Sequence, residues 1–148
     1  MLAALLILSS TVVSAEWETF KSADGMYEYT KDGVITAYYG DEFAFFPAEI
    51  DGTKINEIGV MACVGSEIES ISFAEGIELI NTNAFEGCNA ESAYIPSSVK
   101  NIGERAFANC TNLNEVTLNS EEITFDFDVF VGTGFIQFYI PCTADEHV

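Results

Sequence analysis

The residue types best suited to covalent or acid–base chemistry are sparse in this sequence. The one histidine is His147, the second residue from the end of the 148-residue chain. A catalytic serine or cysteine needs a neighbouring base, so we expect no serine–histidine or cysteine–histidine nucleophile. The four cysteines show no Cys-x-x-Cys spacing, which gives a zinc site little support. They are Cys63, Cys88, Cys110 and Cys142.

Carboxylates are abundant, and their placement decides whether two of them could act as an acid–base pair. Asp126 and Asp128 flank Phe127, and Glu121 adjoins Glu122. Glycoside hydrolysis requires two carboxylates held across a cleft with the sugar between them, and no cleft-forming pattern is present. No loop has the ligand spacing of a calcium site. We therefore expect no catalytic residues, no bound metal and no cofactor.

The overall charge excludes some partners and favours others. The chain has 24 acidic and 5 basic residues, a formal net charge of −19, and Arg105 is its last basic residue. Such a surface repels nucleic-acid phosphates and anionic lipids, so we expect no nucleic-acid partner. It attracts cations or a basic patch on another protein. The alternative is that the charge only keeps the protein soluble.

Residues 1–15 are typical of a secretory signal peptide. Residues 2–8 are an apolar run, and residues 13–15 offer small side chains at the cleavage position. The stretch is too short to span a bilayer, which takes about 20 apolar residues. No lysine or arginine precedes the apolar run, which departs from the usual signal. We expect a secreted or cell-surface protein, with no membrane insertion after signal cleavage.

Internal repeats are the elements that would position any site. Three segments align at a spacing of 22 residues and a fourth follows at 23, so residues 55–141 are predicted to form about four repeats. The aligned segments are residues 55–73, 77–95, 99–118 and 122–140. Repeats of this length stack into a solenoid, in which each repeat contacts only its neighbours.

Aligned positions in the repeats form columns of one chemical character. The large apolar column is Ile58, Ile80, Ile102 and Phe125. The small column is Ala62, Ala84, Ala106 and Val129, and the bulky column is Cys63, Phe85, Phe107 and Phe130. Two further columns contain only residues that tolerate positive φ: Gly59, Asn81, Gly103, Asp126 and Gly65, Gly87, Asn109, Gly132. We expect a left-handed turn at both columns.

Each repeat ends in a short stretch that alternates inward and outward, which is typical of a half-buried strand. Residues 71–73, 93–95, 116–118 and 138–140 have this pattern, residues 45–46 repeat it, and Pro96 and Pro141 end two of the strands. Five strands stacked about 4.8 Å apart would form one parallel sheet. Its outward positions are the candidate ligand-binding residues: Ser70, Ser72, Ser92, Tyr94, Glu115, Thr117, Gln137 and Tyr139.

The two tyrosines of this strand face form a contact strip for a protein or a glycan, because tyrosine supplies contact area at a low entropy cost. The alternative is that aromatic and β-branched residues simply favour strands.

The segment before the repeats, residues 16–54, is predicted to form an N-terminal hairpin cap and the first layer of the solenoid. Asp32-Gly33 lies between two alternating, aromatic-rich stretches, which is a strong hairpin signal. Asp51-Gly52 indicates a second turn. A cap is needed because a terminal repeat would otherwise expose its apolar side. Residues 142–148 are expected to form a short tail.

Cys88 and Cys110 occupy one column in adjacent repeats. One strand spacing lies within the Cα range of a disulfide, and export implies an oxidising compartment. The alternative is that both remain free, because buried cysteines commonly just fill space. Cys63 and Cys142 lie at opposite ends of the array and are not expected to pair.

Three phrases of the sequence carry a family resemblance. They are Ile102-Gly103-x-x-Ala106-Phe107-x-x-Cys110-x-x-Leu113, Ile95-Pro96-x-x-Val99 and Pro47-x-x-Ile50-Asp51-Gly52. With them the chain resembles the BspA-like leucine-rich repeat proteins of bacterial and protozoan surfaces. The implied fold is mostly β with short helical or irregular turns. It is a leucine-rich-repeat-type solenoid with a parallel strand face and an N-terminal β-hairpin cap.

The resemblance implies binding rather than catalysis, so we expect that the chain is not an enzyme. The expected function is a secreted or surface-associated binding module, used for adhesion to host or neighbouring-cell proteins through the strand face. Its partner would be an extracellular or cell-surface protein, or a glycan, bound by a monomer. Two alternatives stay open: a structural, self-associating surface-coat component, and an accessory repeat module of a larger secreted protein.

Overall fold

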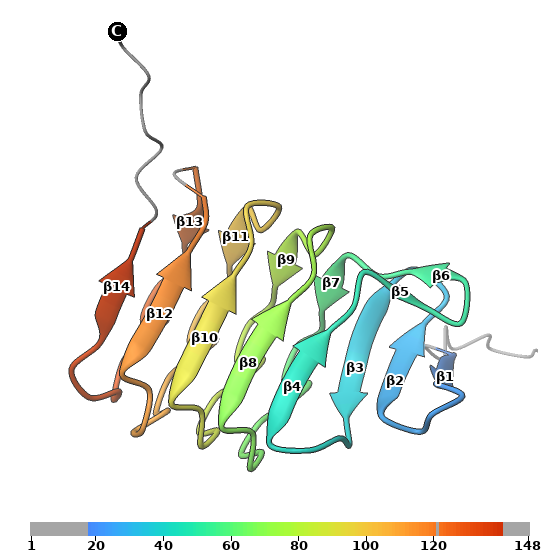
Figure 1. Cartoon of the computed structure of the whole chain (residues 1–148), viewed down its shortest axis with the longest axis horizontal. Coiled ribbons are helices and arrows are strands. Elements are labelled where there is room, and N and C mark those ends of the chain that lie inside the picture. The colour runs from blue at the N-terminus through green and yellow to red at the C-terminus, as the bar shows by residue number, and fades with distance from the viewer. Residues whose placement is uncertain (1–17, 121, 141–148) are drawn as a thin grey trace, which may run out of the picture.

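The computed structural model describes residues 18–120 and 122–140, and all its regular elements are strands. No helix occurs among these residues, so the turns between strands are irregular rather than helical. Figure 1 shows the strands stacked side by side from the cap at one end to β14 at the other. The expected class, a mostly β solenoid with a parallel strand face and an N-terminal cap, is confirmed.

Five short strands form the strand face. They are β4 (Phe43–Phe46), β8 (Ser70–Phe73), β10 (Ser92–Ile95), β12 (Glu115–Leu118) and β14 (Gln137–Tyr139). Their order is β14-β12-β10-β8-β4 and every neighbouring pair is parallel. The first strand, β4, comes from the segment that precedes the repeats and pairs with β8. Pro96 follows the last residue of β10, where its missing N–H ends the ladder.

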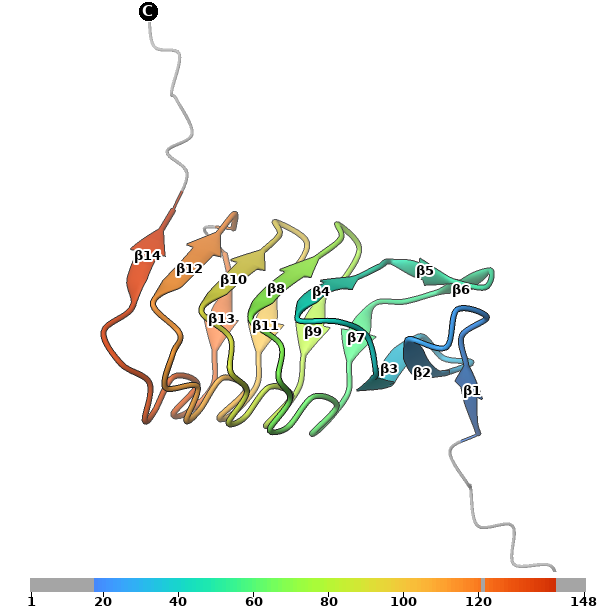
Figure 2. The same ribbon diagram turned by 60° about the horizontal axis from the view of Figure 1, so that its bottom comes forward.

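A second sheet lies on the opposite side of the solenoid (Figure 2). Its strands are β1 (Thr19–Lys21), β2 (Tyr27–Thr30), β3 (Val34–Tyr38), β7 (Glu57–Ile58), β9 (Leu79–Ile80), β11 (Asn101–Ile102) and β13 (Thr124–Phe125). From β3 to β13 it is parallel, and β1 and β2 extend it antiparallel. The sequence predicted only one sheet, because two-residue strands are too short to show alternation.

Two hairpins build the cap. The predicted hairpin pairs β2 with β3, and Gly33 in its turn has a φ of 88°. A second hairpin joins β5 (Glu49–Ile50) to β6 (Thr53–Lys54) through Asp51 and Gly52, with φ values of 49° and 82°. Two successive positive φ values define the turn type that matches the twist of a hairpin. Both turns expected from Asp-Gly pairs are therefore present.

The core runs between the two sheets as columns of identical positions. Ile35, Ile58, Ile80 and Ile102 are fully buried, one from each layer. A phenylalanine column lies beside them: Phe85 and Phe107 stack with centroids 5.2 Å apart, and Phe107 and Phe130 with centroids 5.7 Å apart. Each repeat therefore buries its apolar side against the next, as a solenoid requires.

The two glycine-rich columns differ in their backbone. Gly65, Gly87, Asn109 and Gly132 all have positive φ, as predicted. The other prediction was wrong, because Gly59, Asn81, Gly103 and Asp126 do not have positive φ. The left-handed residues lie two positions further on: Met61, Asn83, Arg105 and Asp128.

Close backbone approach accounts for the glycines of the column that was mispredicted. A Cβ on Gly59 would lie 2.8 Å from the Ile35 carbonyl oxygen, and a Cβ on Gly103 would lie 2.7 Å from the Thr82 nitrogen. The missing side chain thus lets successive layers pack tightly at this point.

Parts of the predicted organisation lie outside the described residues: the signal peptide at 1–15, Pro141 and the tail at 142–148. Within the described residues, nothing has the length and apolar character of a membrane-spanning helix.

Candidate functional site: the strand face

The outward residues of the strand face form two straight rows, because the strands pair in register. The first row is Phe43, Ser70, Ser92, Glu115 and Gln137. The second row is Phe45, Ser72, Tyr94, Thr117 and Tyr139. All eight residues predicted for this face are exposed or half-buried, so the structure brings them together on one surface. Whether they bind a ligand stays a prediction.

Aromatic rings recur on alternate strands of the second row. Phe45 is 52% exposed, Tyr94 42% and Tyr139 49%, with the smaller Ser72 and Thr117 between them. Two strand spacings separate successive rings by about 9.6 Å. The surface therefore presents flat aromatic area at regular intervals, with hydroxyl groups between the rings.

Sequence reasoning missed two aromatic residues of this face, Phe43 and Phe45. The signal was present, because residues 43–46 alternate and the structure buries Ala44 and Phe46 while exposing both other rings. Beneath Phe45, the Tyr27 hydroxyl donates a hydrogen bond of 2.5 Å to the Phe45 carbonyl. Burial raises the pKa of Tyr27 to about 12, so this hydroxyl remains a donor that ties β4 to the cap.

Hydrogen bonds orient several of the polar groups in the two rows. The Ser92 hydroxyl donates to the Ser70 hydroxyl at 3.1 Å, and the Tyr139 hydroxyl donates to the Gln137 side chain at 3.1 Å. The Asn119 side-chain amide donates to the Tyr94 hydroxyl. Tyr94 and Tyr139 are therefore held in place before any partner arrives, which lowers the entropy cost of binding.

A row of carboxylates, here called the acidic margin, borders the strand face. It consists of Glu42, Glu69 and Glu91, which lie just before the first residue of β4, β8 and β10, and of Glu115, which is the first residue of β12 and also belongs to the first row; all four are exposed. The Glu69 N–H donates to the Glu42 carbonyl and the Glu91 N–H to the Glu69 carbonyl, both at 2.7 Å. The acidic margin therefore follows consecutive layers of the solenoid.

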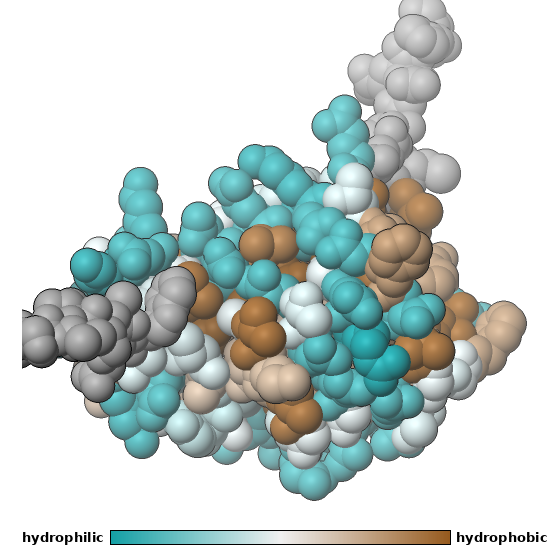
Figure 3. Space-filling model, turned by 180° about the vertical axis from the view of Figure 1, so that it is seen from behind, coloured by the Kyte–Doolittle hydropathy of each residue, from teal (hydrophilic) through white to brown (hydrophobic). Residues whose placement is uncertain are grey.

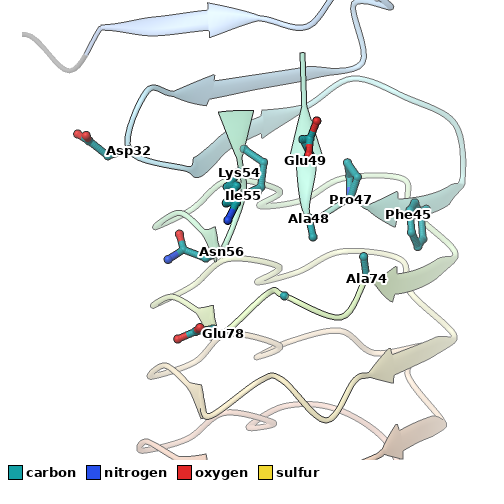
Figure 4. Close-up of a pocket in the computed structure, with 11 residues that line it drawn as sticks. Asp32, Phe45, Pro47, Ala48, Glu49, Lys54, Ile55, Asn56, Ala74 and Glu78 are labelled. Carbon is teal, nitrogen blue, oxygen red and sulfur yellow. The ribbon is translucent and has the colours of Figure 1, made fainter. Parts of the chain in front are cut away.

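A separate hollow of about 800 Å³ lies beside the β5–β6 hairpin (Figure 4). Its lining includes Asp32, Glu49, Lys54 and Glu78, with Phe45 at the corner nearest the strand face. No serine, cysteine or histidine lines it, so it lacks a nucleophile–base pair. Among the described residues, no three histidine, cysteine or carboxylate side chains are grouped closely enough to hold a metal ion.

The cysteines lie in the core. The Cys88 and Cys110 sulfur atoms are 3.3 Å apart, and the Cys110 thiol also donates to the Phe85 carbonyl at 3.0 Å. Both are free thiols in this structure, as is the buried Cys63, while Cys142 lies outside the described residues. The hydrogen bond between Cys110 and Cys88, followed by burial, raises the pKa of Cys110, and the same contact lowers the pKa of Cys88; burial raises the pKa of Cys63. Thiols with raised pKa values are poor nucleophiles, and formation of the disulfide stays a prediction.

Hydrophobic side chains gather at the C-terminal end of the solenoid (Figure 3). A hollow of about 550 Å³ there is lined by Leu118, Phe125, Asp126, Val129, Phe130, Phe138 and Ile140. Phe138 and Ile140 occupy inward positions of the last layer, yet they are 47% and 58% exposed. In the described part of the chain, no further layer packs on them.

A family model described as the BspA type leucine rich repeat region (6 copies) matches residues 41–146. The chain belongs to this family. The resemblance inferred from the sequence phrases is thereby confirmed. No curated protein matches the BspA-type chain.

Two solved structures resemble this BspA-type protein in fold. A leucine-rich repeat protein from Bacteroides capillosus superposes with a TM-score of 0.71 at 22% identity, covering 84% of this chain and 99% of that one. The pneumococcal vaccine antigen PcpA superposes with a TM-score of 0.52 at 17% identity, covering 83% of this chain and 38% of that one. At these identities the likeness shows the fold alone.

Proposed function

We propose that this BspA-type protein is a secreted or surface-associated binding module, which uses its strand face for adhesion to proteins of a host or of neighbouring cells. The observation behind the proposal is the pair of in-register rows with exposed aromatic rings on alternate strands. Solenoids of this kind bind partners along an extended face. A rigid surface that presents tyrosine and phenylalanine is suited to protein contacts, in which aromatic residues dominate the binding energy.

Two further observations support an extracellular role. Residues 1–15 have the composition of a secretory signal peptide. One solved structure with the same fold is a vaccine antigen of a bacterium. Adhesion at a surface is the use that fits both the fold and export.

Replacing Tyr94 and Tyr139 together with alanine tests the proposal. We expect affinity for a partner, selected from an array of purified extracellular-matrix and cell-surface proteins, to fall by about thirtyfold or more, equivalent to about 2 kcal/mol. Unfolding temperature should change little, because both rings are about half exposed. Affinity would be measured by surface plasmon resonance and stability by circular dichroism.

The matched control replaces Met61 and Phe127, which are 61% and 82% exposed in turns away from the strand face. This control removes comparable apolar area and should leave affinity unchanged. Equal losses in both double variants would contradict a specific role for the strand face.

The apolar hollow at the C-terminal end favours a second candidate function, a self-associating coat component. Exposed apolar area of this kind is typical of interaction surfaces. We expect the protein to remain monomeric in sedimentation velocity across the micromolar range, because the strand face is the primary binding surface. Concentration-dependent oligomers that disappear in Phe138→Ser would instead support the coat function.

A further inference from the structure

The strand face carries acidic side chains and no basic ones. The strand-face strands and the residues leading into them, 41–46, 67–73, 89–95, 112–118 and 135–140, contain six carboxylates and no lysine or arginine. The six are Asp41, Glu42, Glu67, Glu69, Glu91 and Glu115, and all are exposed. The two ion pairs of the described residues, Lys100–Glu78 and Arg105–Glu86, involve none of them.

The acidic margin places like charges on successive strands of the face. The backbone N–H of Glu69 bonds the Glu42 carbonyl and that of Glu91 bonds the Glu69 carbonyl, so the backbones of successive glutamates lie about one strand spacing, or 4.8 Å, apart. Like charges on neighbouring positions of adjacent strands repel one another. A cationic segment lying along the acidic margin would relieve several of these repulsions at once.

A hollow of about 430 Å³ opens at the N-terminal end of the acidic margin. Its lining is Tyr38, Tyr39, Gly40, Asp41, Glu42, Ser66, Glu67 and Ile68. It combines three carboxylates with two tyrosines, and the buried Ser66 hydroxyl has no hydrogen-bond partner. The chain itself places a cation here, because Lys21 Nζ lies 5.0 Å from the centroid of the Tyr39 ring.

We propose that the strand face recognises a basic, extended segment of its partner protein. Lysine or arginine side chains of that segment bind along the acidic margin, and one enters the hollow beside Tyr39. This inference rests on the proposed function, since it names the partner chemistry of the same face. A guanidinium or ammonium group pairs with carboxylates of adjacent strands, while its apolar stem lies against the exposed rings of Phe45 and Tyr94.

The charge distribution distinguishes this partner from a glycan. A neutral glycan can donate hydroxyl hydrogen bonds to these six carboxylates but brings no positive charge to balance them, and an acidic glycan is repelled by them. A basic protein segment uses both features of the face, the charge and the aromatic rings.

The test is a fluorescence-anisotropy titration with a labelled peptide of alternating lysine and serine, and with a glutamate–serine peptide of the same length. The basic peptide should bind the full chain, more weakly as salt is raised. Combined replacement by glutamine of Glu42, Glu69, Glu91 and Glu115 should reduce that affinity by about tenfold or more, because several exposed ion pairs are lost together. The glutamate–serine peptide should not bind.

The matched control replaces four carboxylates outside the strand face by glutamine: Glu18, Glu49, Glu104 and Glu122, all exposed. It has the same net charge and should bind the basic peptide within about twofold of the unmodified protein, as expected for surface positions. If both fourfold variants lose affinity equally, the attraction is nonspecific and the inference is overturned. The inference is also overturned if the two fourfold variants bind the glycans of an array equally well.

Different results would contradict the proposed function and this inference. If the array-selected protein binds the Glu-to-Gln margin variant normally but not Tyr94→Ala with Tyr139→Ala, the strand face still binds and only the basic-segment inference is wrong. If neither variant changes binding to that protein, the proposed function is wrong as well.

Discussion

Replacing Phe107 with alanine should lower the free energy of unfolding by about 3–5 kcal/mol, as expected for the loss of a buried aromatic ring. Phe107 is 1% exposed and stacks on Phe85 on one side and Phe130 on the other, with centroids 5.2 and 5.7 Å away. Because both neighbours are rings of the same column, neither can move to fill the space without leaving its own contacts. The cavity therefore persists.

The matched control is Phe135→Ala, because that ring is 85% exposed. Its free energy of unfolding should change by no more than about 0.5 kcal/mol, as for other surface substitutions. Both values come from urea unfolding followed by circular dichroism. A cost below about 1.5 kcal/mol for Phe107→Ala would show that the column does not stabilise the solenoid as described.

Replacing Gly33 with alanine should cost about 3 kcal/mol or more, combining left-handed strain with a steric overlap. Gly33 has a φ of 88°, and a Cβ there would lie 2.4 Å from the Lys54 carbonyl oxygen. The Gly33 carbonyl also accepts hydrogen bonds from the N–H groups of Asn56 and Glu57. A shift of Gly33 would therefore weaken the junction between the cap and the first repeat.

The Gly52→Ala variant distinguishes the cost of left-handed backbone strain from the cost of steric overlap. Gly52 also follows an aspartate in a hairpin turn and has a φ of 82°, but a Cβ there would meet nothing within 4 Å. Its cost should be limited to left-handed strain, about 1–2 kcal/mol. Equal effects of the two substitutions in thermal and urea unfolding would mean that the turn at Gly33 has room to relax.

The strand face and its outward residues could be predicted from the sequence because alternation and period act together. For a residue such as Tyr94, alternation within its strand predicts that the side chain points outward. The repeat spacing of 22 residues predicts which residue lies beside it on the next strand. The hairpins were predictable for a similar local reason, since Asp-Gly requires a specific turn.

Other features could not be predicted from the types of single residues. Met61 and Arg105 adopt positive φ although neither residue type favours it, because the left-handed position is set by hydrogen bonding between layers. The Met61 N–H donates to the Thr82 carbonyl, and the Arg105 N–H to the Phe127 carbonyl. The C-terminal hollow and the acidic margin depend in the same way on which layers are neighbours, and they become visible only in three dimensions.

Because the strands of the strand face pair in register, the length of this face is proportional to the number of repeats. Each repeat adds about 4.8 Å of length and one outward pair of side chains, without changing the pairs already present. Gain or loss of a whole repeat would thus change the length of the partner segment that the strand face can bind. The side chains presented by the remaining repeats would stay the same. The length of the binding surface and the side chains that it presents can therefore vary independently in such a protein.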